Sequence, residues 1–324
     1  MHVVIATALL SFTAGCHARS LAGKTPLVVA LDFHGVVMDS EPVMARVAWR
    51  TSSRLWPQMV QESAATERVM DESAYVDRRR LGGEPLRGTD DSADEMPNWL
   101  RAKMRLLSPI MQTDEDALLL LRLCMDEASS ADSRKRPLTV GEIIANWGSD
   151  LKETLQLRYR LQEHEASKAC AETRAAWQED APSDWAEAHQ QFPATLAEMR
   201  EAVGSSSPTL YFFARSGADA CEMQTVLANH GIQLPPECFV TAARAQGKVD
   251  ALATLRVRHA DATLRFVDDC SDSLRAAAAD PRLFSLQPFF ASWGYSTAQQ
   301  MSRVAAMPRV RELTSSRELG SVLE

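Results

Sequence analysis

The amino-acid sequence predicts an α/β protein: a doubly wound parallel sheet of the Rossmann type, with a large helical cap inserted after its first strand. From about residue 208 onward, short apolar strands alternate with helices, a pattern typical of parallel sheets covered on both faces. One further apolar strand, at residues 27–31, lies far from the others in sequence and precedes a long helical stretch. We therefore expect residues 25–45 and 195–324 to form the α/β core and residues 46–194 to form the cap.

The first strand is the continuous apolar run LVVAL at residues 27–31, bounded by Pro26 and Asp32. A run without polar alternation indicates a strand that is buried on both faces, as in the middle of a parallel sheet. A helix is expected to begin at about Pro42. Residues 62–97 combine paired glycines with dense mixed charge, which indicates a flexible loop or a partly disordered insertion.

Residues 98–178 are predicted to be helical because their apolar residues recur at helical spacing. Two helix starts are marked by local sequence: Thr113 has Asp116 three residues later, and Thr139 has Glu142, as in capping boxes. The elements expected after residue 208 are strands at 209–213, 238–241, 263–267 and 283–287, and helices at 219–231, 248–259 and 271–279.

Composition narrows the class of protein. The chain has 324 residues, of which 45% are hydrophobic, so it can bury a sizeable core. Its net charge of −8 argues against a nucleic-acid-binding surface, which needs clustered Lys and Arg. The six cysteines are scattered and none form a C-x-x-C pair, so neither a disulfide framework nor a zinc site is expected.

Residues 1–24 differ from the rest of the chain and are expected to be a targeting segment. An apolar run from Val3 to Ala14 precedes small residues and Arg19, which resembles a signal peptide with a cleavage site. The run is short for a bilayer span, and we expect no stable membrane span elsewhere. Because no Lys or Arg precedes the run, a plastid-type segment or a translation start placed too early also fits.

Four groups of residues follow the strands of the predicted sheet and carry its candidate chemistry. They are Asp32 at the end of the first strand, Ala214 to Gly217 after the strand at 209–213, Lys248 opening a helix, and the pair Asp268 and Asp269. In a parallel sheet, all of these positions face one crevice. Carboxylates beside a lysine suit a hard metal ion with an oxyanion, because Mg²⁺ binds carboxylates and phosphate oxygens and a carboxylate can attack phosphorus.

Several stretches of the sequence carry a family resemblance. They include DFHGVVMDSE after the first strand, GKVDAL around Lys248, RFVDDCSDSL around the acidic pair, and ASWGYSTAQQMSRVAAMPRVREL near the C-terminus. With MPNWLRAKMRLLSPIMQT, PLTVGEIIANW and QQFPATL between them, they cover roughly residues 26 to 324 in order. The chain resembles the haloacid dehalogenase (HAD) superfamily, and more narrowly a branch of HAD-like hydrolases from plants and algae.

The resemblance implies a role for each matching residue. Asp32 matches the nucleophile that forms an aspartyl-phosphate and also binds Mg²⁺, and Lys248 matches the lysine that neutralises the phosphoryl group. Asp269 is expected to bind Mg²⁺ directly, and Asp268 to bind the ion or its water. The expected substrate is a small phosphorylated molecule.

Two positions depart from the family pattern. His34 replaces the second Asp of the motif D-x-D-G, which is the general acid and base; its backbone carbonyl can still bind Mg²⁺, and an imidazole can transfer protons near neutral pH. Ala214 stands where the family has a Thr or Ser whose hydroxyl holds the phosphoryl group. Arg215 and Ser216 are the remaining candidates for a phosphate contact.

These departures leave two functional hypotheses open. The first is a Mg²⁺-dependent HAD-like phosphatase that works through Asp32. The second is a catalytically inactive HAD-like protein that binds a phosphorylated ligand or a protein partner, which His34 and Ala214 favour. Dehalogenase chemistry is disfavoured because it does not need the metal that the acidic pair suggests. Residues 293–295, WGY, are interpreted as packing near the last strand.

Overall fold

The computed structural model describes residues 25–64, 96–129, 136–205, 207–215, 217–242 and 245–324. Within these residues, a six-stranded sheet has the order β5-β4-β1-β6-β7-β8, and every neighbouring pair is parallel. The strands are β1 (Leu27–Asp32), β4 (Thr209–Ala214), β5 (Phe239–Thr241), β6 (Thr263–Asp268), β7 (Gln287–Ala291) and β8 (Arg311–Leu313). The expected α/β class with a parallel, helix-covered sheet is confirmed.

Strand β1 occupies the middle of this sheet and is apolar because both of its faces are covered. Val29 pairs with Leu210 of β4 on one side and with Arg265 of β6 on the other. Alternate residues of β1 face two separate hydrophobic cores, Val28 and Ala30 belonging to one and Val29 and Leu31 to the other. This arrangement explains why the run at 27–31 shows no polar alternation.

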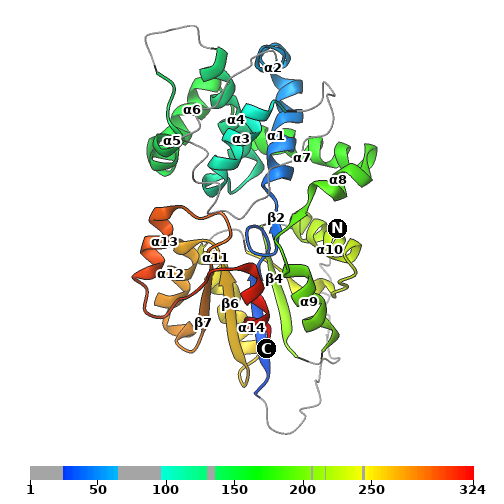
Figure 1. Cartoon of the computed structure of the whole chain (residues 1–324), viewed down its shortest axis with the longest axis vertical. Coiled ribbons are helices and arrows are strands. Elements are labelled where there is room, and N and C mark those ends of the chain that lie inside the picture. The colour runs from blue at the N-terminus through cyan, green and yellow to red at the C-terminus, as the bar shows by residue number, and fades with distance from the viewer. Residues whose placement is uncertain (1–24, 65–95, 130–135, 206, 216, 243–244) are drawn as a thin grey trace, which may run out of the picture.

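Helices cover the two faces of the sheet (Figure 1). They are α9 (Thr195–Gly204), α10 (Gly217–Asn229), α11 (Ala245–Arg258), α12 (Ser271–Ala279), α13 (Ala298–Ala305) and α14 (Leu319–Leu323). Val249 of α11 and Leu274 of α12 pack in the core that contains Val28. Leu196 of α9 and Val322 of α14 pack in the core that contains Val29.

Between β1 and β4 lies a set of helices that we call the helical region. It consists of α1 (Glu41–Leu55), α2 (Pro57–Ala64), α3 (Asn98–Leu107), α4 (Asp114–Ser129), α5 (Val140–Asn146), α6 (Lys152–Tyr159), α7 (Glu163–Asp180) and α8 (Pro182–Ala188). Both expected helix starts carry reciprocal capping bonds: Thr113 with Asp116 at α4, and Thr139 with Glu142 at α5. Figure 1 shows α1 to α6 gathered at one end of the molecule and the six-stranded sheet at the other.

A small antiparallel ladder lies where the chain passes from the core to the helical region and back. Strand β2 (Met38–Asp39) pairs with β3 (Gln190–Gln191). This ladder joins the two connecting segments, which are far apart in sequence. The expected division at residues 45–46 and 194–195 stays a prediction.

Two expected elements need correction. The strand predicted at 283–287 is wrong, because Pro281–Leu283 form a short 3₁₀ turn and the strand is Gln287–Ala291. Leu283 and Leu286 are buried although they precede the strand, so an apolar run there does not mark its position. Helix α11 begins at Ala245, which places Lys248 within its first turn rather than at its start.

Two further expectations concern residues that the structure describes only in part or not at all. The targeting segment at 1–24 lies outside the described residues, as does most of the loop expected at 62–97, whose residues 62–64 belong to α2. Among the described residues, no helix combines the length and apolarity that crossing a membrane requires.

Candidate metal and catalytic site

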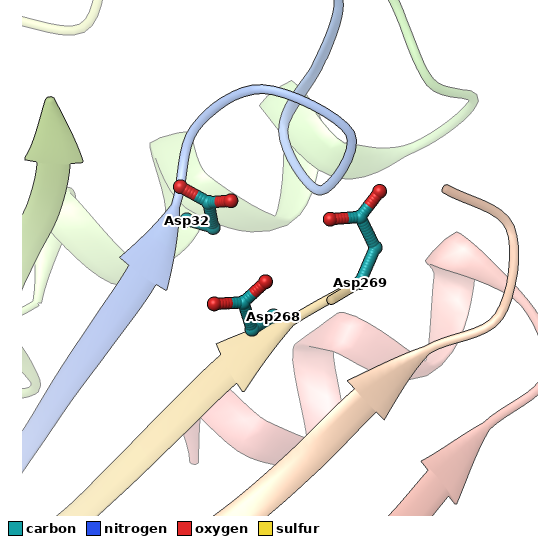
Figure 2. A group of neighbouring side chains, drawn as sticks. All are labelled: Asp32, Asp268 and Asp269. Carbon is teal, nitrogen blue, oxygen red and sulfur yellow. The ribbon is translucent and has the colours of Figure 1, made fainter. Parts of the chain in front are cut away.

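Three carboxylates converge at the carboxyl ends of two adjacent strands. Asp32 ends β1, Asp268 ends β6, and Asp269 follows it directly. Figure 2 shows the three side chains turned toward one another from these strand ends, and one oxygen of each lies within 4.8 Å of the others. The parallel pairing of β1 with β6 brings these residues together, as the sequence predicted.

Lys248 is the cation beside this group. From the first turn of α11, its Nζ lies 2.8 Å from Asp32 Oδ2 and 2.8 Å from Asp268 Oδ2. Burial alone would lower the pKa of Lys248, but Asp268 and Asp32 raise it well above its ordinary value. Lys248 therefore stays charged and bridges the ends of β1 and β6.

The three carboxylates carry more negative charge than Lys248 balances. When all are ionised, two negative charges remain without a partner cation inside the group. Burial raises the pKa of Asp269 well above its ordinary value, and Asp268 and Asp32 raise it further. Burial also raises the pKa of Asp268, although Lys248 opposes that effect. A divalent cation would balance this excess negative charge, because it would favour the ionised form of both acids.

The donor set fits Mg²⁺. This ion takes oxygen ligands at about 2.1 Å, so ligand oxygens on opposite sides of it lie roughly 4 Å apart. All three of Asp32, Asp268 and Asp269 offer oxygen ligands, and one carboxylate oxygen of each lies within 4.8 Å of the others. One or two carboxylates with substrate oxygens form a common Mg²⁺ site.

The turn after β1 packs closely against Asp269 and excludes side chains there. Gly35 has a φ of +88°, and a Cβ at this position would overlap Asp269 Oδ2. A Cβ on Gly294 would overlap the Gly35 carbonyl oxygen and would lie 2.5 Å from Asp269 Cβ. Only glycine combines this left-handed φ at Gly35 with the available space. The two glycines thus allow Asp269 to lie against the backbone of the turn.

The segment WGY at 293–295 does more than pack near the last strand. The Tyr295 N–H donates to Asp269 Oδ2 at 2.5 Å, and Trp293 Nε1 donates to the Val36 carbonyl at 3.1 Å. These bonds tie the loop after β7 to both the acidic pair and the turn after β1. The sequence had indicated only a packing role because both partners follow other strands: Asp269 is 26 residues away and Val36 is 257 residues away.

His34 follows Asp32 by two residues in the sequence, but its ring contacts other residues. Its Nδ1 lies 2.6 Å from Ser40 Oγ, and its Nε2 lies 2.8 Å from Asp219 Oδ1. The Nη2 atom of Arg215 is also near, 3.1 Å from Nε2. Asp219 was not among the sequence candidates. Its spacing of four residues from Arg215 at a helix start was the one available signal.

The described residues at the end of β4 and directly after it are Ala214 and Arg215. They provide a cation but no side-chain hydroxyl. Ala214 is fully buried, and its carbonyl accepts a hydrogen bond from the Ala242 N–H at 2.7 Å. The Arg215 guanidinium donates from Nη1 to the Gln112 carbonyl in the helical region at 2.8 Å. Ser216, the other phosphate candidate, lies outside the described residues.

A second charged cluster joins the helical region to the core. Arg105 of α3 donates from Nη1 to Asp39 Oδ1 at 2.6 Å, and the same atom lies 3.3 Å from Glu41 Oε2. The Tyr295 hydroxyl donates to Asp39 at 2.7 Å and accepts from the Glu41 N–H at 2.8 Å. Burial raises the pKa of Glu41 to about 7, although Arg105 opposes it. This cluster holds the start of α1 between α3 and the loop that contacts Asp269.

Comparison with known proteins gives structural neighbours. No family model matches the chain, and no curated protein sequence matches it. A haloacid dehalogenase-like hydrolase from Streptococcus pneumoniae is 11% identical, with a TM-score of 0.43, covering 92% of this chain and 99% of that one. A predicted phosphatase from Clostridium acetobutylicum is 9% identical, with a TM-score of 0.41, covering 92% and 98%. Because these identities and scores are low, we base the function on the residues of this chain.

Proposed function

We propose that this protein is a HAD-like hydrolase of the plant and algal branch that its sequence resembles. Its proposed activity is Mg²⁺-dependent hydrolysis of a small phosphate ester through an aspartyl-phosphate on Asp32. The observation that supports this proposal best is the meeting of Asp32, Asp268, Asp269 and Lys248 at the ends of β1 and β6. Such an arrangement would supply a nucleophile, a metal site and a fixed cation at one edge of the sheet.

The proposed reaction has two steps. In the first, a carboxylate oxygen of Asp32 attacks phosphorus, the bond from phosphorus to the leaving oxygen breaks, and His34 gives that oxygen a proton. In the second, water attacks the phosphorus of the aspartyl-phosphate, His34 takes the proton of the water, and Asp32 and inorganic phosphate are released. Lys248, held 2.8 Å from Asp32, balances charge on the phosphoryl oxygens in both steps.

Asp32, Asp268 and Asp269 would hold the Mg²⁺ ion, together with the backbone carbonyl of His34. The bound ion would neutralise negative charge on the phosphoryl oxygens. Among the described residues, Arg215 is our candidate for a further phosphate contact, since its guanidinium is partly exposed and lies beside His34. We also propose that Ser216 contributes to phosphate binding.

A second candidate function is a catalytically inactive HAD-like protein that binds a phosphorylated ligand or a protein partner. The observation that favours it is Ala214, which ends β4 with no hydroxyl to offer. Loss of one oriented donor costs on the order of 10²-fold in rate. The two functions share the metal and anion site and differ only in whether turnover occurs.

The test of the proposed function combines turnover with ion binding. We expect the full-length protein to hydrolyse at least one member of a phosphate-ester panel with Mg²⁺ and none with EDTA. We also expect Mg²⁺ at about a hundred times its dissociation constant to stabilise the fold by about 2.7 kcal/mol at pH 7.5. Turnover that persists in EDTA would contradict the metal-dependent mechanism, and Mg²⁺ binding without any turnover would support the inactive alternative.

Mg²⁺ should stabilise the folded protein less at acidic pH than at neutral pH. The pKa of both Asp268 and Asp269 is raised in the folded state, so both acids favour folding while protonated and lose that contribution as pH rises. Below pH 7, protons compete with Mg²⁺ for these carboxylates. We therefore expect a smaller Mg²⁺-induced rise in Tm at pH 5.5 than at pH 7.5, measured by thermal unfolding. An equal rise at both pH values would mean that the ion binds elsewhere.

The replacement Ala214→Thr tests whether the missing hydroxyl limits the rate. A hydroxyl at the end of β4 should raise kcat for phosphate esters, by up to roughly 10²-fold if it reaches the phosphoryl group. Because Ala214 is fully buried, the larger side chain should also cost about 1–3 kcal/mol of stability. Ala214→Val is the matched control: it adds similar bulk without a donor, and a gain in kcat with Val would contradict a role for the hydroxyl.

A further inference from the structure

Asp269 takes its orientation from the loop that follows β7. The residue is buried, and its Oδ2 accepts the backbone N–H of Tyr295 at 2.5 Å. Its Oδ1 accepts no hydrogen bond from the described residues. Within that part of the chain, the Tyr295 N–H is therefore the donor that decides which oxygen of Asp269 faces the loop.

Side-chain contacts fix the position of this loop. Residues 292–297 lie between β7 and α13 and belong to neither element, so no helix or strand bonding holds them in place. Trp293 attaches the loop to the turn after β1. The Tyr295 hydroxyl attaches it to the start of α1, because it donates to Asp39 Oδ1 at 2.7 Å and accepts the Glu41 N–H at 2.8 Å.

Arg105 connects the helical region to the same attachment. From α3, its Nη1 lies 2.6 Å from Asp39 Oδ1, the oxygen that also accepts the Tyr295 hydroxyl. The side chains of Arg105 and Asp39 are only 21% and 10% exposed, so water competes little for this contact. A continuous series of hydrogen bonds therefore joins the helical region to the three carboxylates: Arg105, Asp39, Tyr295 and Asp269.

The placement of a ligand oxygen matters strongly for a small, hard ion. Mg²⁺ demands near-ideal geometry, so displacing one ligand oxygen weakens binding. Residues that hold a metal ligand in place typically contribute about 10–100-fold to metal affinity. The Tyr295 N–H holds Asp269 in this way, and the hydroxyl of the same residue holds the N–H.

We infer that the Tyr295 side chain is a positioning residue for Asp269 and that Arg105 extends this support from the helical region. Together they set the affinity of the three carboxylates for a divalent cation. The inference rests on the proposed function, in which Asp269 binds Mg²⁺. Neither side chain has to contact the ion, because each acts on the position of the loop.

The replacement Tyr295→Phe tests the inference directly. It removes the hydroxyl and keeps both the ring and the backbone N–H that Asp269 accepts. The Glu41 N–H keeps a weaker acceptor in Asp39 Oδ1 at 3.4 Å, which should preserve the fold. We expect the dissociation constant of Mg²⁺ to rise by about tenfold or more, measured by isothermal titration calorimetry on the full-length protein without substrate.

A second tyrosine provides the matched control. The Tyr159 hydroxyl also donates to a carboxylate, Asp126 Oδ2 at 3.2 Å, but both residues lie in the helical region. Tyr159→Phe therefore removes the same kind of hydrogen bond away from Asp269. It should leave the Mg²⁺ dissociation constant within about twofold of the wild-type value.

The replacement Arg105→Met tests the link to the helical region. It should raise the Mg²⁺ dissociation constant by less than Tyr295→Phe does, because Asp39 still accepts the Tyr295 hydroxyl. The double variant should bind Mg²⁺ no more weakly than Tyr295→Phe alone, since both changes act through one series of bonds. Fully additive effects would contradict a shared route. If one single variant fails to fold, the other still permits the calorimetric measurement.

A kinetic measurement separates positioning from a general loss of structure. In Tyr295→Phe, the Mg²⁺ concentration that gives half of the maximal turnover should rise by the same factor as the dissociation constant. A smaller fraction of folded protein would lower the maximal turnover but would leave that concentration unchanged.

Two results would overturn the inference. One is a Mg²⁺ dissociation constant in Tyr295→Phe within about twofold of the wild-type value, and the other is an equal rise in Tyr159→Phe. If the wild type binds Mg²⁺ but hydrolyses no ester, the proposed activity fails, whereas calorimetry still decides the role of Tyr295. A wild type that binds no Mg²⁺ would overturn both.

Discussion

Asp32→Asn is expected to reduce phosphate-ester turnover by at least about 10³-fold, the largest effect of any single replacement in this protein. The amide keeps the size of the carboxylate but has no negatively charged oxygen to attack phosphorus. It also removes one of the two carboxylates that hold Lys248, while Asp268 keeps the other contact at 2.8 Å. The measurement is kcat on the best ester of the panel, for protein shown to be folded by circular dichroism.

Controls separate the nucleophile from a general effect of removing a carboxylate. Asp272 is an exposed acid four residues after Asp268, and it pairs with Arg275. Asp272→Asn should therefore leave kcat unchanged. Acid-quenched mass spectrometry of the wild type during turnover should show a phosphoryl group on the peptide that contains Asp32. Turnover of the Asp32→Asn protein near the wild-type rate would exclude catalysis through an aspartyl-phosphate.

Lys248→Met is expected to damage both stability and turnover. Removing the ammonium leaves the buried Asp268 without its cation and brings three carboxylates together unopposed. Breaking one side of a buried ion pair costs about 3–5 kcal/mol. Turnover should fall by about 10²-fold or more, because a fixed charge on the phosphoryl oxygens is lost.

The pH dependence of this variant has a definite sign. Without Lys248, the pKa of Asp268 and of Asp269 should rise further in the folded protein, since the opposing positive charge is gone. Acids with a raised folded-state pKa contribute stability at low pH and lose it as pH rises. Urea unfolding in EDTA should therefore show a larger loss of free energy at pH 8 than at pH 5.

Lys103→Met is the matched control for that experiment. Lys103 pairs with Glu127 at 2.9 Å inside the helical region, with exposures of 15% and 14% that resemble those of the Lys248 pairs. It should destabilise the fold without lowering kcat of the remaining folded protein. If both lysine variants lose turnover equally, the loss comes from destabilisation and Lys248 has no special role at the phosphoryl group.

Local sequence was enough for most of the sheet and for the acidic part of the site. The run at 27–31 lacks alternation because both faces of β1 are covered, so it could be assigned to a central strand before any contact was known. Asp32 and Asp268 could be placed together because parallel strands bring their carboxyl ends to one edge. The starts of α4 and α5 were also readable, since a capping box involves residues only three apart.

Tertiary structure decided the features that depend on residues distant in sequence. Asp219 reaches His34 across 185 residues, Arg105 reaches Asp39 across 66, and Gly294 lies against Gly35. No periodicity or motif encodes such meetings, because they arise when separate strands and helices pack. The start of β7 was likewise misplaced, since Leu283 and Leu286 are buried by packing around a turn. The sequence by itself thus determined β1, β4, β5, β6 and the acidic edge of the sheet, whereas packing determined where β7 lies and how His34 is held.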